Sequence, residues 1–340
     1  MAVTSALKGI GLRRTIAAIV CLVLAVCSPA LEAAGLEYDP LLATDHGVDS
    51  VELVLADENR EREIPLKVYL PDGDQPAPVV LFSHGLGGSR NGARYLGEHL
   101  AARGYLAVFV QHPGSDESVW KGRFEGRMRA MRQAASPKNL VLRCQDVKVV
   151  LDQFSDWHAK AGHPLSGRIC LDRIGMSGHS FGAQTTQAIA GQSLPLVGQK
   201  FFDERIDAAI AYSPSSPLNN SSKSFANVSV PWMLMTGTKD VVPIGRQTVE
   251  TRRQVFTALP KSIDRFELVL YEAQHSVFGG RTTRSTNPNH HQVILALTTA
   301  FWDAYLKNDE RARVWLTGEE ARQLLEPNDQ WQWLSKREVD

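Results

Sequence analysis

The stretch IGMSGHSFGAQ, residues 174–184, holds the pattern Gly-x-Ser-x-Gly, with its two glycines at Gly178 and Gly182. The apolar residues Ile174 and Met176 lead into the pattern as a short strand does, and a helical pattern follows it. A serine on a tight turn between a strand and a helix is the arrangement of a nucleophile elbow, which exposes the serine hydroxyl. The glycines leave no side chains to obstruct the backbone at that corner. A plain glycine turn before a helix is the alternative, and the rest of the chain decides between the two.

Strand and helix patterns alternate on both sides of this stretch. Strands are expected at 47–56, 64–70, 78–82, 106–110, 206–212, 231–236 and 266–271, and helices at 95–103, 140–154 and 293–306. The uninterrupted apolar run at 78–82 indicates a strand buried on both faces, as in a parallel sheet. The segment 213–229 is too short for a large helical cap, and the tail at 316–334 predicts a short helix and a tryptophan-containing packing segment. These patterns predict one α/β domain over residues 35–340, with a mostly parallel central sheet flanked by helices.

A glycine-rich turn directly follows the expected strand at 78–82. Its sequence is Ser-His-Gly-Leu-Gly-Gly over residues 83–88. In enzymes with a nucleophile elbow, the turn after the third strand supplies a backbone N–H group that binds an oxyanion. A phosphate-binding loop and a plain turn are the alternatives, but no Gly-Lys-Ser/Thr follows the glycines, which argues against the phosphate loop.

Candidates for an acid and a base follow the elbow in the chain. A serine nucleophile needs a base to take its proton and an acid to orient that base. In this class of fold the chain order is serine, then an acid, then histidine. Asp240 comes just after the expected strand at 231–236, and His275 comes just after the strand at 266–271. Ser180, Asp240 and His275 therefore have the order and the strand-end positions of a catalytic triad.

The other histidines fit the role of the base less well than His275 does. His84 and His179 belong to the glycine-rich turn and the elbow, His46, His99, His158 and His163 precede the elbow, His112 is early but at the expected pocket edge, and His290 and His291 begin a helix. The adjacent pair His290 and His291 also lacks the partner spacing of a metal-binding motif. We therefore expect neither a metal nor another cofactor.

Several segments together resemble one enzyme family. The segments are FSHGLGG at 82–88, GHSFG at 178–182, GTKD at 237–240, Gln274-His275 and FWDAYL at 301–306. They are similar to the plasma-type platelet-activating-factor acetylhydrolases and to bacterial relatives described as predicted dienelactone hydrolases. The likeness runs from about Leu53 to Trp315, most of the chain after the N-terminal segment. The serine at the elbow departs from true dienelactone hydrolases, which use a cysteine.

The resemblance implies an α/β-hydrolase fold without a large cap, and it implies roles for individual residues. Ser180 would be the nucleophile, His275 the base and Asp240 the acid. The backbone N–H groups of Leu86 and Phe181 would hold the oxyanion. The residues expected to support this turn and elbow are His84, Gly85, Gly178, His179 and Gly182.

The expected activity is hydrolysis of carboxylic esters through an acyl-enzyme, on short-acyl esters as in acetylhydrolases. A small-molecule or lipid ester would be the substrate. A secreted lipase or polyester hydrolase is the runner-up, and a peptidase comes third. A hydrolase fold that only binds ligands belongs to a different class, and it predicts an incomplete triad.

The first residues of the chain have the pattern of a secretory signal peptide, which we place at residues 1–34. A basic start with Lys8, Arg13 and Arg14 precedes an apolar run at 16–27 and then small residues. This run is short for a membrane span and fits the apolar part of a signal. Cleavage near Ala34 would remove three basic side chains and one acidic one, changing the net charge from 0 to −2. The prediction is an exported protein, with an uncleaved membrane anchor as the alternative.

The net charge bears on a nucleic acid partner, and the cysteine content bears on a disulfide. The net charge of zero gives no reason to expect a nucleic acid partner. Cys144 and Cys170 remain after cleavage of the signal, and an oxidising compartment would permit a disulfide between them. Two free thiols are the alternative, and the spacing does not decide. The oligomeric state is equally open.

A basic amphipathic helix is expected at 120–132. Trp120, Phe124, Met128 and Met131 would form an apolar stripe, opposite a face rich in lysine and arginine. A surface helix with a solvated face is one interpretation. The other is a lid or a peripheral contact with a membrane or micelle through the Trp120–Met131 segment.

Overall fold

The computed structural model describes residues 38–43, 47–121, 124–217, 221–242, 244–282, 284 and 286–336. These residues belong to one compact unit, Tyr38–Asp340. The expected signal peptide at 1–34 lies outside the described residues.

One sheet organises this unit, and within the described residues it contains nine strands in the order β1-β2-β4-β3-β5-β6-β7-β8-β9. The strands are β1 (Asp49–Asp57), β2 (Arg62–Leu70), β3 (Ala77–Ser83), β4 (Leu106–Val110), β5 (Ile169–His179), β6 (Ala208–Tyr212), β7 (Trp232–Lys239), β8 (Arg265–Gln274) and β9 (Gln330–Leu334). The pairs from β4 through β3, β5, β6 and β7 to β8 are parallel, while β1, β2 and β9 pair antiparallel. This is the α/β-hydrolase fold, and the expectation of a mostly parallel sheet is confirmed.

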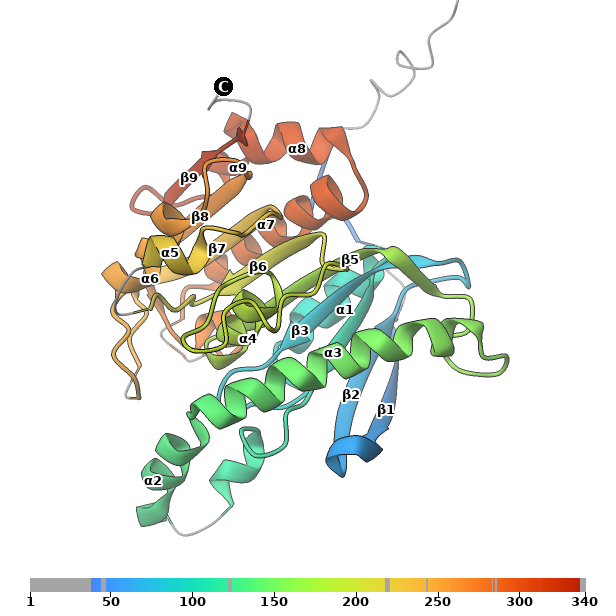
Figure 1. Cartoon of the computed structure of the whole chain (residues 1–340). Helices are drawn as coiled ribbons and strands as arrows, with labels where there is room; N and C mark the ends of the chain where they lie inside the picture. Colours follow the sequence, from blue (N-terminus) through green and yellow to red (C-terminus); the bar gives the residue numbers. More distant parts are fainter. Residues whose placement is uncertain are drawn as a thin grey trace, which may run out of the picture. The chain divides into compact units, whose positions relative to one another are not determined.

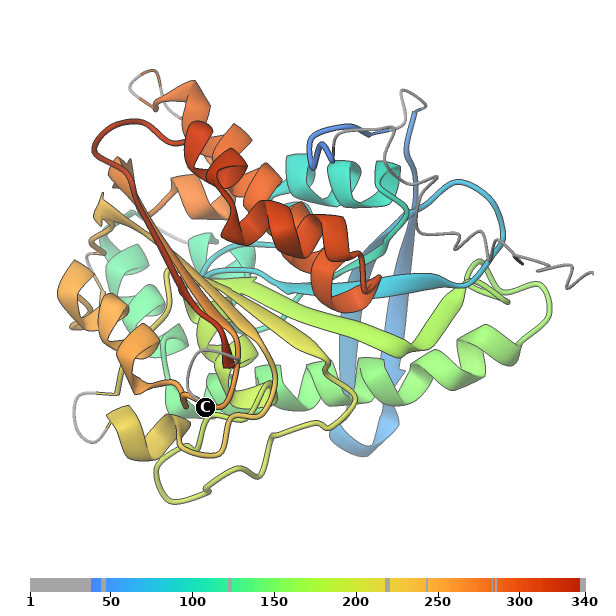
Figure 2. The ribbon, with the colours of Figure 1, turned by 90° about the horizontal axis from the view of Figure 1, so that it is seen from above.

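Helices cover both faces of the sheet (Figures 1 and 2). One face carries α3 (Pro137–Ala159), α4 (Phe181–Ile189) and α6 (Val249–Ala258), and the other carries α1 (Arg94–Ala102), α7 (Pro288–Leu306), α8 (Glu310–Thr317) and α9 (Glu319–Gln323). The remaining elements of the described chain are α2 (Phe124–Ala134), α5 (Ser221–Phe225) and the 3₁₀ turns η2 (Glu58–Arg60), η3 (Glu117–Trp120) and η4 (Val277–Gly279).

Two apolar cores result, one on each face of the sheet. Neighbouring residues of β3 show the division, because Val79 packs in the core under α3 and Val80 in the core under α7. Both side chains are fully buried. Successive side chains of a strand point to opposite faces, so a strand covered on both sides is apolar throughout. This explains the uninterrupted run at 78–82.

The prediction of one continuous helix at 120–132 is wrong, because Trp120 and Met128 belong to two separate elements. Trp120 ends η3, and α2 begins only at Phe124. Asp116 caps η3 by accepting a hydrogen bond from the Ser118 N–H at 3.3 Å, which starts a separate short turn. Trp120 therefore does not share one helical stripe with Met128.

The structure also contains two elements that the sequence patterns did not predict, the helix α6 and the strand β9. Cys144 and Cys170 are both free thiols, so the alternative without a disulfide holds in the structure. Burial raises the pKa of the Cys144 thiol to about 12, which leaves it protonated at neutral pH.

Candidate active site

Ser180 occupies the turn between β5 and α4 in a strained backbone conformation. Its φ of 57° and ψ of −110° lie in a region that residues with a side chain rarely adopt. The Ser180 N–H donates to the carbonyl oxygen of Tyr212 on β6 at 2.9 Å, which fixes the strained turn to the sheet. The side chain is partly exposed and lines a cavity. This is the geometry of a nucleophile elbow.

Both elbow glycines are required by close backbone contacts. A Cβ atom at Gly182 would overlap the carbonyl oxygen of Ser83, at the end of β3. A Cβ atom at Gly178 would overlap the carbonyl oxygen of Gly182. The elbow and the following helix therefore lie directly against the start of the glycine-rich turn at 83–88, a contact that any side chain would prevent.

The structure brings Ser180, His275 and Asp240 into one hydrogen-bonded chain. The Nε2 atom of His275 lies 2.8 Å from the Ser180 hydroxyl oxygen, and its Nδ1 atom lies 2.6 Å from a carboxylate oxygen of Asp240. The three residues follow β5, β8 and β7, at the carboxyl ends of parallel strands. With Nδ1–H donating to the carboxylate, Nε2 is free to accept the hydroxyl proton.

Asp240 is fully buried, and its surroundings keep it ionised. Burial alone would raise the pKa of Asp240, but the hydrogen bond from His275 and the charge of Arg252 hold it below its ordinary value. The Thr236 hydroxyl donates to the other carboxylate oxygen at 2.9 Å. Arg252, from α6, lies 3.2 Å from the carboxylate and is itself buried. The sequence interpretation missed Arg252 because it lies in the helix that the periodicity did not reveal.

A close approach of β7 and β8 brings the acid and the base together. A Cβ atom at Gly237 would overlap the carbonyl oxygen of Ala273, so only glycine permits this distance. The register between the two strands shifts between Gly237 and Lys239. Asp240 follows directly on one strand and His275 on the other.

His179, the residue before the nucleophile, contacts the loop of the catalytic histidine candidate. Its Nε2–H donates to the carbonyl oxygen of His275 at 3.0 Å, and the two rings are 4.5 Å apart. Side chains at Gly85 or Gly279 would collide with its ring. Burial lowers the pKa of His179 well below its ordinary value, with the neighbouring His275 adding to the effect, so the ring is neutral at pH 7.

The backbone N–H groups expected to hold an oxyanion are those of Leu86 and Phe181. Within the described part of the chain, no hydrogen-bond acceptor is found for the backbone N–H of Leu86 or of Phe181. The next two N–H groups of the turn are used, Gly87 donating to Ser115 at 2.9 Å and Gly88 to Gly85 at 3.0 Å. Leu86, Gly85, His84 and Ser180 all line the same cavity.

The cavity beside Ser180 has a volume of about 1320 Å³. Its walls include apolar side chains from the glycine-rich turn, from η3 and from the segment after β7. These are Leu86, Trp120, Val241, Val242 and Ile244. The Trp120 indole N–H donates to the carbonyl oxygen of Gly87 at 2.7 Å, so this side chain covers the glycine-rich turn. The sequence interpretation placed Trp120 on a helix and did not connect it to that turn.

His112 is not at the pocket edge, which corrects the expectation from the sequence. Its side chain is fully buried behind the turn, with Nε2 2.9 Å from the Ser83 hydroxyl and Nδ1 3.0 Å from Asp146. Among the described residues, no group of three or more His, Cys, Asp or Glu side chains is arranged to hold a metal ion. None of the helices in that part of the chain is long and apolar enough to cross a membrane.

Comparison with known families gives one match. Residues 63–148 match the family model of platelet-activating factor acetylhydrolase, isoform II. The matched segment runs from β2 into α3 and includes the glycine-rich turn, whereas Ser180, Asp240 and His275 lie beyond it. A search of curated proteins found no match. The family match supports the resemblance to the acetylhydrolase group, and it supports a hydrolase of the α/β-hydrolase fold.

Proposed function

We propose that the protein is a serine carboxylic-ester hydrolase, with Ser180 as nucleophile, His275 as base and Asp240 as orienting acid. The observation that carries the proposal is the continuous chain of hydrogen bonds, 2.8 Å from Ser180 to His275 and 2.6 Å from His275 to Asp240. A serine hydroxyl is a weak nucleophile until a positioned base takes its proton.

In the first step, His275 Nε2 takes the proton of the Ser180 hydroxyl while the hydroxyl oxygen bonds to the ester carbonyl carbon. The π electrons of the carbonyl move to its oxygen, and the N–H groups of Leu86 and Phe181 hold the oxyanion. Each donor of this kind stabilises the transition state by roughly 3 kcal/mol. The C–O bond to the alcohol then breaks, and the alcohol leaves with the proton from His275.

In the second step, water hydrolyses the acyl-enzyme. His275 takes a proton from water, whose oxygen bonds to the acyl carbon through a second oxyanion in the same place. The bond to Ser180 then breaks, Ser180 recovers its proton from His275, and the carboxylic acid leaves. Asp240 stays ionised throughout and stabilises the imidazolium that forms twice in each cycle.

The substrate we propose is an ester with a short acyl group and a bulky, partly apolar alcohol. The resemblance to acetylhydrolases supports the short acyl group. The cavity of about 1320 Å³, with its apolar walls, supports a bulky partner such as a lipid. A lipase or polyester hydrolase is distinguished by acyl-chain length, because a site built for acetyl groups loses rate steeply beyond about four carbons. We also propose export, on the basis of the pattern in residues 1–34.

The test is turnover of p-nitrophenyl acetate by the wild type and by Ser180→Ala. The variant should retain less than about a thousandth of the wild-type kcat, because the nucleophile is lost while binding remains. A fluorophosphonate probe should label the wild type at Ser180 and leave the variant unlabelled. Wild-type protein without ester turnover and without labelling would point instead to a hydrolase fold that only binds ligands.

A further inference from the structure

Arg143, on α3, is a buried cation behind the glycine-rich turn. Its side chain is 0% exposed. Within the described residues, no carboxylate forms an ion pair with it. Its guanidinium donates instead to neutral groups: to the carbonyl oxygen of His84 at 2.7 Å and to the Ser115 hydroxyl at 2.8 Å. Burying a charge without a direct carboxylate partner is costly, so the hydrogen bonds that satisfy the guanidinium show where Arg143 acts.

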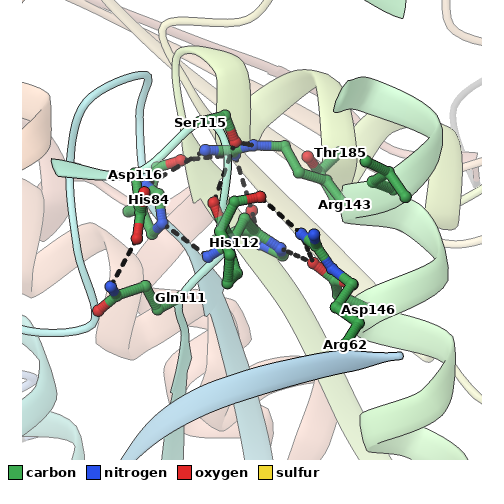
Figure 3. A network of polar contacts seen from close by, with 12 residues as sticks. Arg62, His84, Gln111, His112, Ser115, Asp116, Arg143, Asp146 and Thr185 are labelled. Atoms are coloured by element: carbon green, nitrogen blue, oxygen red, sulfur yellow. Dashed lines mark hydrogen bonds and ion pairs between the residues drawn. The ribbon is translucent and has the colours of Figure 1, made fainter. Parts of the chain in front are cut away.

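Two of the residues that Arg143 contacts, Phe181 and His84, carry or lie close to the two proposed oxyanion donors. Its guanidinium carbon lies 4.5 Å from the centre of the Phe181 ring, a cation–π contact with the residue that carries one donor. On the other side it holds the turn that carries Leu86 (Figure 3). One planar side chain therefore joins the elbow to the glycine-rich turn.

The peptide group that contains the Leu86 N–H is fixed from both directions. The preceding peptide group is held by Arg143 through the His84 carbonyl oxygen. The following one is held through the Gly87 N–H, which donates to the carbonyl oxygen of Ser115, the residue whose hydroxyl Arg143 also binds. The peptide group itself is held at its carbonyl oxygen, on Gly85, by the Gly88 N–H at 3.0 Å and the His84 ring at 2.7 Å.

A second group of buried residues keeps this arrangement in place. The His112 N–H donates to Nε2 of His84 at 3.0 Å, and the His112 ring lies 3.0 Å from Asp146 (Figure 3). Asp146 is one turn along α3 from Arg143 and also accepts from Arg62 at 2.7 Å. Burial lowers the pKa of Arg143 to about 9, so the guanidinium is still charged at neutral pH.

We infer that Arg143 is a positioning residue for the oxyanion hole, holding the N–H groups of Leu86 and Phe181 at the spacing that the tetrahedral oxyanion requires. The inference rests on the proposed function, because it concerns the same reaction. Lysine carries the same charge but a single ammonium group, so it cannot bind the His84 carbonyl and the Ser115 hydroxyl in one plane. Displacement of a catalytic group by about 1 Å can cost roughly a hundredfold in rate.

The test compares Arg143→Lys and Arg143→Met with the wild type, on p-nitrophenyl acetate. The kcat is expressed per active site titrated with an organophosphate, so that misfolded protein is not counted. We expect kcat to fall about tenfold in Arg143→Lys and about a hundredfold in Arg143→Met, with KM within about threefold of wild type. The affinity for a trifluoromethyl ketone, which forms a tetrahedral adduct on Ser180, should fall by the same factor as kcat/KM.

Arg265→Met is the matched control. Arg265 is also buried, donates to a carbonyl oxygen, that of Leu259, and lies 5.4 Å over the Phe256 ring. It begins β8, at the opposite end of that strand from His275. This variant should lose thermal stability as the Arg143 variants do and keep the wild-type kcat per titrated site.

The inference is overturned if the Arg143 variants keep wild-type kcat per titrated site, or if Arg265→Met loses as much. Should both Arg143 variants fail to fold, Ser115→Ala removes one arm of the contact and leaves the arginine in place. A kcat loss of about threefold with parallel loss of ketone affinity supports the inference, and unchanged values for both overturn it. Wild-type protein without ester turnover would instead refute the proposed function, so the two failures are distinct.

Discussion

The imidazole of His179 donates a hydrogen bond to the carbonyl oxygen of His275 at 3.0 Å, so the residue before Ser180 is bonded to the backbone of the residue that we propose as its base. The centres of the two rings lie 4.5 Å apart, so the His179 ring packs against the His275 ring. The elbow therefore positions Ser180 and also contacts the backbone that carries His275 after β8.

His179→Ala should lower kcat by about tenfold with little change in KM, because the base would lose a fixed position while the cavity remains. The measurement is steady-state turnover of p-nitrophenyl acetate, together with the rate of fluorophosphonate labelling, which should fall in proportion. His163→Ala is the control, since the ring of His163 also packs against another ring, that of Trp157, but away from the cavity. Equal losses in both variants would contradict the role of His179.

Gly182→Ala should abolish activity, because its Cβ atom would overlap the carbonyl oxygen of Ser83. The elbow and the glycine-rich turn would have to separate, moving Ser180 away from the oxyanion donors. We expect a loss of more than a hundredfold in kcat and a clear drop in melting temperature. A Cβ atom at Gly126 in α2 meets nothing within 4 Å, so Gly126→Ala should leave kcat unchanged and should not lower the melting temperature. Substantial activity in Gly182→Ala would refute the close contact.

The free energy of unfolding should begin to fall at about pH 6.5 as the solution is acidified. This is a higher pH than protonation of carboxylates alone would require. Burial lowers the pKa of His112 to about 4, the charges of Arg143 and Arg62 act in the same direction, and the contact with Asp146 opposes them. The ordinary value is 6.5. Between these values the unfolded chain binds more protons than the folded one, so the free energy of unfolding falls as the pH falls. Burial also lowers the pKa of His84 and His179, which adds to the trend.

The check is urea unfolding at pH 7.5 and pH 5.0. For His112 alone the free energy of unfolding should be about 2 kcal/mol lower at pH 5.0. His112→Gln keeps a hydrogen-bonding side chain without a titrating ring, so the difference between the two pH values should shrink by about that amount. An identical pH dependence in the variant and the wild type would show that His112 is not the group involved.

Trp120→Ser should weaken turnover of long-chain and micellar esters more than that of the acetate. The indole packs over Gly87 at the cavity and is 37% exposed, so it offers apolar surface to a long substrate. Rates on p-nitrophenyl esters from two to twelve carbons test this. Met128→Ser is the control, because Met128 is exposed on α2 but does not line the cavity. An equal loss at all chain lengths in Trp120→Ser would rule out this role for the indole.

The central part of the fold was predictable because its signals are local. The run at 78–82 is apolar throughout since β3 is covered on both faces, and the elbow glycines mark a turn that only glycine permits. The relative positions of Ser180, Asp240 and His275 followed from strand ends, because carboxyl ends of parallel strands meet at one edge of a sheet.

Arg252, Arg143 and strand β9 could not be predicted, because their structural roles depend on tertiary contacts that leave no periodic pattern in the sequence. Arg252 points inward from α6 to Asp240, so the buried face of that helix is not purely apolar and its pattern is weak. Arg143 is similar, because an arginine within a helix is usually solvated and only the packing of two loops shows it buried. The alternation at Gln330–Leu334 becomes strand β9 only because β8 offers an open edge.

The buried contacts of His112 mean that the same hydrogen-bond sequence occurs twice in this protein. Ser83, His112 and Asp146 are linked in the order serine, histidine, aspartate, at 2.9 Å and 3.0 Å, and all three are fully buried. A geometric template for a catalytic triad would therefore retrieve two hits from one chain. They differ in backbone strain and access to the cavity: Ser180 stands on a strained turn and lines it, and Ser83 ends a regular strand and does not. If Ser180 is the nucleophile that we propose, comparing the two serines separates the contribution of the hydrogen-bonded histidine and aspartate from that of backbone strain and access to the cavity.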